Sequence, residues 1–343
     1  MSFTKLDSTD YVISADSVTA PAWSSNTPTL STFFLQSTGV SSSFYTDVYN
    51  ATPSSINAAI QFSIAFGNAF GTGSGPLNSL VLTNTPTRIN YGQFRNLVYG
   101  DAESFFNFGT ENPSSKNIAA ISIDRNRYKE SLFPGTFNLH MKSGSTTIKL
   151  TDDSLDSTVI TYLDCGRVFN IVSGSNGSGA STTKATGALR NGYTISGSYG
   201  LFLPDIGTII LNTDALGLPI ANGGLNIPWY TGTAAAGGLN NNLQVFNAIS
   251  ASGNFQLNSQ ETISSNYIFV RIKNGEYNYT TNPSIITGSG DFIYSNFINS
   301  PQTYVTTVGM YNNNNELLAV AKLSKPLVKD FTKEALIRVK LDW

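Results

Sequence analysis

Apolar and polar side chains alternate at every second position in short runs along much of this chain. The clearest run closes the sequence, where one face would carry Ile337, Val339, Leu341 and Trp343, and the other Arg338, Lys340 and Asp342. A period of two is that of a β-strand, because successive side chains of a strand point to opposite faces of the sheet. Such runs predict an all-β fold of antiparallel, β-sandwich-like domains with long polar loops.

Turn-forming residues separate further runs of this kind. Pro134-Gly135 and Ser143-Gly144-Ser145 favour turns, and we predict consecutive antiparallel strands over residues 60–66, 118–123, 136–141 and 146–150.

Nearer the C-terminus, the same alternation predicts strands over residues 267–273, 304–311 and 316–323. The four Asn residues at 312–315 would form the turn of a hairpin, since Asn tolerates left-handed backbone. We expect Lys325-Pro326 to break the ladder after this hairpin.

Helix signals are scarce, and two polar segments interrupt the strands. Short helices are predicted only at residues 54–59 and 214–216. Residues 173–197 and 223–242 are rich in Gly, Ser, Ala and Asn, and we expect long exposed loops there. The apolar segment between them, residues 200–212, must be buried.

The chain divides into three predicted parts. Residues 1–30 would form an extended N-terminal arm, residues 31–244 the main β domain, and residues 245–343 a C-terminal antiparallel β domain. The arm contains Trp23 among Ser, Thr and Pro. Two interpretations stay open: Trp23 docks on a neighbouring protein, or it covers the edge of its own domain.

Charge is unusually low. Charged residues make up 12% of the chain, about half of the roughly 25% typical of globular proteins, and the net charge is −2. A weakly charged polar surface suits a subunit that packs against many partners. No Lys and Arg cluster of the kind that binds nucleic acid is present, and no apolar run approaches the length of a membrane span. We therefore expect neither nucleic acid nor a membrane as a partner.

Cysteine usage and the N-terminus indicate the compartment. Cys165 is the one cysteine, so no intrachain disulfide can form. The opening residues lack the basic and apolar run of a secretion signal. Both observations predict assembly in a reducing cytoplasm.

Residues for common catalytic and metal chemistry are few. His140 is the only histidine and lies within a predicted strand, and Cys165 is interpreted as a core residue. The acidic group Asp152, Asp153 and Asp156 lacks the central Gly and terminal Glu of a helix-loop-helix calcium site. We expect no catalytic residue, cofactor or metal.

Glycoside hydrolysis is the one enzymatic alternative, because it needs only two carboxylates beside aromatic side chains. Asp101 and Glu103 are two residues apart and would share a face if they lay on a strand. This pair is the basis of a glycan depolymerase hypothesis.

Three stretches resemble virion structural proteins of T4-like contractile-tailed phages, especially those of marine bacteria. They are residues 3–24, residues 197–207, and a C-terminal set comprising residues 274–279, 307–311 and 317–326. The hairpin at 308–320 is also similar to one in baseplate-proximal domains of tail-fibre proteins. The chain lacks the repetitive shaft of a fibre.

The resemblance implies a non-enzymatic subunit of the tail or baseplate, located in the virion, present in several copies and bound to other phage virion proteins. A host-receptor or glycan-binding tail module, and a neck or capsid-surface protein, are the alternatives. The aromatic side chains that we expect at interfaces are Trp23, Tyr304, Tyr311 and Trp343. The last strand, which ends at Trp343, could pair with the sheet edge of a neighbour.

Overall fold

The computed structural model describes residues 4–35, 44–78, 81, 83–109, 115–156, 160–180, 186–188, 190–233, 237–280 and 282–342. The structure is mostly β, with large antiparallel sheets, which confirms the all-β prediction. The chain forms two compact units. The larger is Val18–Glu261, and the smaller combines Met1–Ser17 with Thr262–Trp343.

This division differs from the expected one. The predicted boundary at residue 245 falls inside helix α3 (Gly237–Ser250), whose Val245, Ala248 and Ile249 are buried in the core of the larger unit. The predicted arm is also divided, because residues up to Ser17 belong with the C-terminal segment and those from Val18 with the larger unit.

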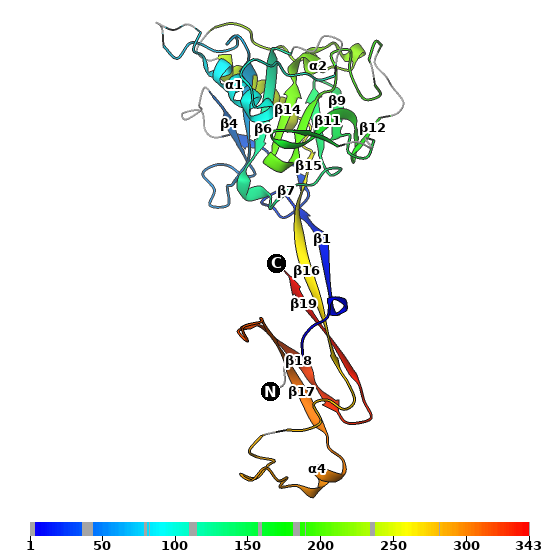
Figure 1. Cartoon of the computed structure of the whole chain (residues 1–343). Helices are drawn as coiled ribbons and strands as arrows, with labels where there is room; N and C mark the ends of the chain where they lie inside the picture. Colours follow the sequence, from blue (N-terminus) through cyan, green and yellow to red (C-terminus); the bar gives the residue numbers. More distant parts are fainter. Residues whose placement is uncertain are drawn as a thin grey trace. The chain divides into compact units, whose positions relative to one another are not determined.

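One long antiparallel sheet organises the larger unit (Figure 1). Its strand order is β2-β15-β8-β9-β11-β13-β14-β6-β5-β4-β3. The strands are β2 (Thr29–Leu30), β3 (Phe34–Leu35), β4 (Thr46–Tyr49), β5 (Ile60–Asn68), β6 (Asn117–Ile123), β8 (Asn138–Ser143), β9 (Thr146–Asp152), β11 (Gly166–Ser175), β13 (Gly200–Leu203), β14 (Thr208–Asn212) and β15 (Phe255–Gln256). Short strands β10 (Thr161–Leu163) and β12 (Ser178–Gly179) pair with β11.

The middle strands of this sheet are buried on both faces. On β14, Ile209 and Leu211 enter one core while Ile210 enters the other. On β13, Phe202 and Leu203 divide in the same way. Strands buried on both faces are apolar throughout, which explains why residues 200–212 form one apolar segment and confirms that they are buried.

The predicted pairing of consecutive antiparallel strands is correct only in part. β8 and β9 form the expected hairpin, with Ser143 paired to Thr146 across the turn. β6 does not continue into this hairpin, because it pairs with β5 and β14 instead.

Helix α1 (Pro86–Tyr99) lies against β5 and β6, and the sequence reading missed it (Figure 1). Thr85 caps its N-terminus by accepting a hydrogen bond from the backbone N–H of Arg88, and Gly100 ends it in a left-handed conformation. The helix backbone comes so close to β5 that a Cβ at Gly67 would lie 2.9 Å from the backbone nitrogen of Tyr91.

Helix predictions had mixed outcomes. α2 (Thr213–Gly217) confirms the helix at 214–216, whereas residues 54–59 form turns and no helix. α3 occupies part of the segment that we expected to be a loop at 223–242. No helix of the described residues is long and apolar enough to cross a membrane.

Residues 173–179 are a tight hairpin and not an exposed loop. β11 turns into β12 at Asn176-Gly177, both of which have positive φ. Asn-Gly is the strongest two-residue hairpin signal. The Asn176 backbone N–H donates to Asn138 Oδ1 on β8, which holds the hairpin against the sheet.

Trp23 lies in the larger core, with 2% of its surface exposed. Its ring packs edge-on against Phe255 at 4.8 Å between centroids. Its indole Nε1 donates to the Phe255 carbonyl at 2.9 Å and to the Pro28 carbonyl at 3.1 Å. Trp23 therefore packs within its own unit, and the docking interpretation is wrong.

Replacing Trp23 by Ala should lower the free energy of unfolding by about 3–5 kcal/mol, because it leaves a large cavity. Trp23→Phe keeps most of the ring volume but leaves the Phe255 carbonyl without its donor, so about 1–3 kcal/mol is expected. Urea unfolding followed by circular dichroism measures both. A native midpoint for Trp23→Ala would contradict the core position.

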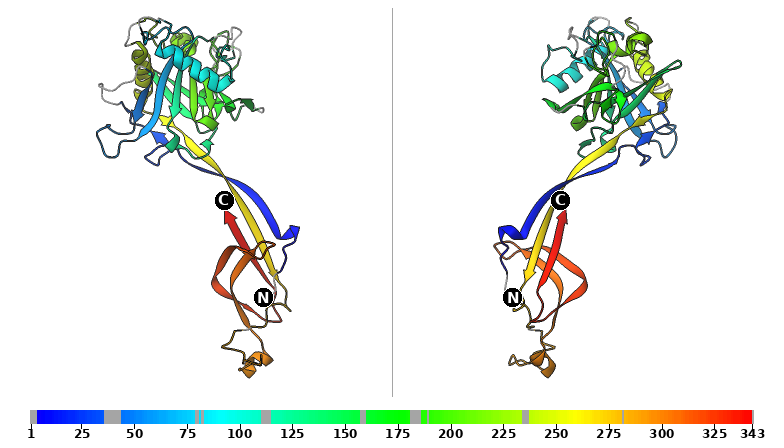
Figure 2. Two further views of the ribbon diagram at one scale, coloured as in Figure 1. Left: turned by 60° about the vertical axis from the view of Figure 1, so that its left-hand side comes forward. Right: turned by 90° about the vertical axis from the view of Figure 1, so that its right-hand side faces the viewer.

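The smaller unit is built from long strands and a short helix, α4 (Ser295–Asn299). In the sheet order β1-β16-β19, β1 is Tyr11–Pro21, β16 is Asn258–Ile272 and β19 is Ala335–Asp342. The first residues of β16 belong to the larger unit, where Ser259 and Gln260 pair with β7 (Ser131–Leu132). β17 (Thr303–Tyr311) and β18 (Leu317–Lys329) form a separate two-stranded ribbon. Figure 2 shows this orange ribbon facing the yellow and red strands.

The ribbon confirms the predicted hairpin, with one difference. Tyr311 pairs with Leu317 across the Asn turn, and Asn315 has a positive φ. β18 continues past Pro326, which we expected to break the ladder. The register shifts between Val305 and Thr307, so Pro326 lies in an irregular stretch of a continuing strand.

The buried core of the smaller unit is small. Among its described residues, the buried apolar ones are Ile272, Ile337 and Val339, and partly buried side chains of β17 and β18 pack on them. Lys329 is also fully buried at the end of β18. Its Nζ donates to the carbonyls of Asn274 and Asp330, each at 2.8 Å, and to Asn278 Oδ1 at 2.9 Å. Lys329 thereby ties the segment after β16 to the ribbon.

Lys329→Met should lower the stability of the smaller unit by about 1–3 kcal/mol, because it removes three donors from buried acceptors. Amide hydrogen exchange by mass spectrometry should show faster exchange in β17 and β18. Lys325→Met on the same strand is the matched control, since Lys325 is exposed and surface substitutions usually stay within about 0.5 kcal/mol. Unchanged exchange in the Lys329 variant would contradict this role.

Candidate interaction surface

Four exposed apolar side chains gather at the turn end of the β17–β18 ribbon. We name Tyr311, Leu317, Leu318 and Val320 the ribbon patch; their exposed fractions run from 42% to 68%. Neighbouring Met310 and Ala321 pack against the core of the smaller unit. The ribbon is therefore apolar on both faces at this end, although an ordinary surface strand is polar on its outer face.

Contacts within the patch hold it together. A Cβ at Gly309 would lie 3.0 Å from the Tyr311 ring and 3.5 Å from a methyl group of Leu317. The Tyr311 ring therefore lies across Gly309 beside Leu317. Gly309 pairs with Val320 on the facing strand, which places Val320 next to the same ring.

The predicted interface residues do not all come together. Tyr304 is 62% exposed and pairs with Val328. It lies seven residues from Tyr311 along β17, about 23 Å at the rise of a strand, so the two tyrosines do not share one contact point. Trp343 lies outside the described residues, and Trp23 is buried.

Two long strands of the smaller unit carry sheet edges. Within the part of the chain that the structure describes, β19 pairs with β16 alone, and β1 lies at the opposite end of the same sheet order. Tyr11, Val12 and Ile13 on β1 are exposed. Unpaired edges present backbone N–H and C=O groups to which another strand can pair.

The candidate glycosidase pair is not on a strand. Asp101 and Glu103 follow the end of α1 in an irregular segment. Asp101 accepts hydrogen bonds from the Ser104 hydroxyl and from the backbone N–H groups of Ser104 and Glu103, and these bonds lower the pKa of its carboxyl. The expected shared strand face is therefore wrong, and a local turn explains Asp101.

His140 and Cys165 lie apart from each other in structural positions. His140 is on β8 opposite Lys149 on β9, and burial together with the Lys149 charge lowers the pKa of its imidazole. Cys165 is buried beside α1 in the turn between β10 and β11, and burial raises the pKa of its thiol.

The three carboxylates near residue 152 are used locally. Asp152 accepts from the Gly135 backbone N–H, Asp153 from the Asn170 backbone N–H, and Asp156 from the Gly179 backbone N–H. Burial raises the pKa of Asp152, and hydrogen bonds from Ser154 and Gly135 oppose that rise. Within the described residues, no three potential metal ligands of the His, Cys, Asp and Glu types form a group.

No protein-family model matches the sequence, and no curated protein or solved structure shows significant similarity to it.

The ribbon patch should contribute little to the fold of the isolated chain. The double substitution Leu317→Ser with Leu318→Ser should change the free energy of unfolding by less than about 0.5 kcal/mol per site, as exposed positions usually do. Ile337→Ala in the core below should cost about 2–5 kcal/mol. Chemical unfolding of both variants compares the two, and a large loss in the serine variant would identify the patch as core.

Proposed function

We propose that this chain is a non-enzymatic structural subunit of a tailed-phage virion, located in the tail or baseplate, that joins neighbouring virion proteins through its smaller unit. The observation that carries this proposal is the ribbon patch. It is an exposed apolar surface on a unit whose own buried core is small. Contiguous exposed apolar surface is typical of protein interaction sites.

The β17–β18 ribbon supports the proposal in two ways. The hairpin that resembles one in baseplate-proximal fibre domains is the β17–β18 ribbon, and the ribbon patch lies at its turn. Fully burying a Leu side chain is worth about 1.5–3 kcal/mol. Covering Leu317, Leu318 and Val320 in an assembly would therefore supply a substantial driving force for docking.

The exposed sheet edges support the same role. A neighbouring strand could extend the sheet at β19 or β1, which would supply main-chain hydrogen bonds, while the ribbon patch would supply apolar contact. A low density of charge suits this mode of assembly, because 12% charged residues repel neighbours weakly.

Incorporation into particles tests the proposal. Particles assembled with the Leu317→Ser, Leu318→Ser chain should contain at least about tenfold less of it than wild-type particles, by quantitative mass spectrometry, because each lost Leu contact is worth more than about 1.4 kcal/mol. The matched control is Ile56→Ser with Leu155→Ser, which removes two exposed apolar side chains of the larger unit.

Two results would overturn the proposal. Absence of the wild-type chain from purified particles would exclude a virion subunit. Equal incorporation of the ribbon-patch variant and the control would exclude the patch as the interface. Density for the ribbon at a contact in cryo-electron microscopy of the tail end would support both parts.

A further inference from the structure

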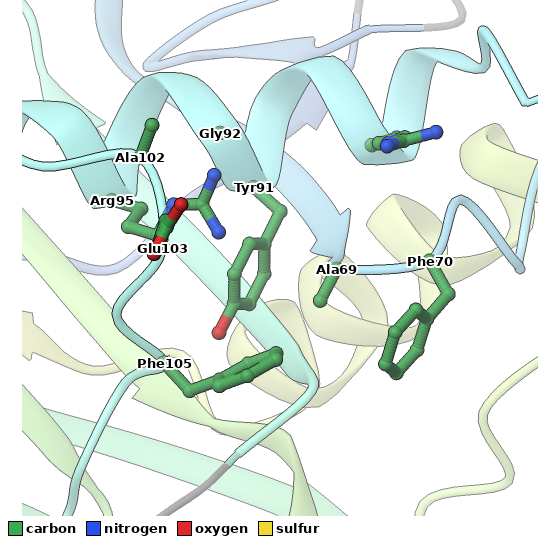
Figure 3. Close-up of a pocket in the computed structure, with 9 residues that line it drawn as sticks. Ala69, Phe70, Tyr91, Gly92, Arg95, Ala102, Glu103 and Phe105 are labelled. Atoms are coloured by element: carbon green, nitrogen blue, oxygen red, sulfur yellow. The ribbon is translucent and has the colours of Figure 1, made fainter.

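A hollow of about 460 Å³ opens beside helix α1 in the larger unit, and we name it the α1 hollow (Figure 3). One wall is a stripe of the helix formed by Arg88, Tyr91, Gly92 and Arg95. Positions three, four and seven apart share one face of an α-helix. Arg88 and Arg95 therefore extend from the same face of the helix, and their backbone positions are about 10 Å apart along its axis at 1.5 Å per residue.

Arg95 brings a guanidinium group to this wall. Its Nε is buried and has no hydrogen-bond partner among the described residues, and its guanidinium carbon lies 5.8 Å from the centre of the Tyr91 ring. Tyr91 is held in place, because its hydroxyl donates to the Ser115 carbonyl at 2.7 Å and accepts from the Phe106 backbone N–H at 3.2 Å. Since the Nε atom is buried while the residue lines the hollow and is partly exposed, an anionic ligand would meet the outer nitrogens of this guanidinium.

Gly92 keeps the hollow open. A glycine inside a helix costs about 1 kcal/mol relative to alanine. Gly92 has no positive φ, and a Cβ built there would meet no atom within 4 Å. Neither backbone conformation nor close packing explains this glycine, whereas a side chain at position 92 would project into the open space.

Aromatic rings form the opposite wall. Phe70 and Phe105 are 60% and 37% exposed, and their centroids lie 6.3 Å apart with planes tilted by 47°. Lys116 places its Nζ 5.4 Å from the centre of the Phe70 ring. Exposed rings next to charged groups offer flat apolar contact together with polar recognition.

We propose that the α1 hollow binds an acidic saccharide. The sugar carboxylate pairs with Arg95, the apolar face of the sugar ring rests on Phe70 and Phe105, and Glu103 on the rim accepts hydrogen bonds from hydroxyl groups. Arg88 and Arg95 outweigh the single carboxylate of Glu103, so the lining favours an anion.

Glu103 distinguishes this ligand from a simple anion. A carboxylate repels phosphate, but it is a good acceptor for sugar hydroxyls. Arginine suits carboxylates because its donors form a planar fork that bonds to both oxygens. The volume accommodates one or two sugar rings, since pockets for small ligands typically span about 300–1,000 Å³. The site is independent of the virion role, because it uses none of the ribbon-patch residues.

Titration calorimetry on the full chain tests the site with three acidic sugars, D-glucuronate, D-galacturonate and N-acetylneuraminate. D-Glucose and inorganic phosphate serve as comparison ligands. At least one acidic sugar should bind about tenfold or more tightly than glucose, because a charge-assisted hydrogen bond contributes about 1.5–3 kcal/mol.

Three variants locate the binding. Arg95→Gln should weaken it by about tenfold or more. Gly92→Leu should abolish it by filling the hollow, and this variant should stay folded because Leu favours a helix more than Gly does. Arg338→Gln is the matched control: Arg338 also lies over a tyrosine ring, Tyr267 at 5.9 Å, but belongs to the smaller unit. It should bind like the wild type.

The proposal is overturned if none of the three acidic sugars shows saturable binding, or if glucose binds equally well. Full binding by folded Gly92→Leu would place the site elsewhere and overturn it as well. Phosphate binding as tight as that of the best acidic sugar would show a general anion site and overturn the saccharide assignment.

Discussion

Burial of the middle of the large sheet on both faces is the constraint on which the rest of the structure depends. Ile209, Ile210 and Leu211 on β14 alternate between two cores, so each face needs its own cover. Helix α1 covers one face, and α3 together with the segment around Trp23 covers the other. The α1 hollow lies between α1, the residues that follow β5 and the loop that follows the helix.

The smaller unit is stabilised in a different way. Its apolar side chains are divided between a small buried core and an exposed outer surface, and the hydrogen bonds of buried Lys329 add to its cohesion. Because few of its apolar side chains are buried, this unit gains little stability from its own core and presents apolar surface to neighbours. The ribbon patch and the exposed sheet edges therefore have one cause: the strands of this unit are longer than its small core can cover.

Both long helices were hidden from sequence reasoning for one physical reason. α1 docks through Asn90, whose amide donates to the Phe66 carbonyl at 3.0 Å, and α3 docks through Asn242, which accepts from the Phe66 backbone N–H at 2.8 Å. Helix prediction looks for apolar side chains at helical spacing, and buried Asn residues read as loop. The stripe of Arg88 and Arg95 was missed with the helix, because their seven-residue spacing has meaning only on a helix.

By itself, the sequence determined the strand content, the burial of residues 200–212 and the hairpin of β17 and β18, because alternation and turn residues act locally. Only the tertiary structure decided that Trp23 is core and that β6 pairs with β5 and β14. Those outcomes depend on contacts between distant segments, such as the bond from Trp23 to the Phe255 carbonyl, and a one-dimensional pattern carries no record of which distant segment will supply the partner.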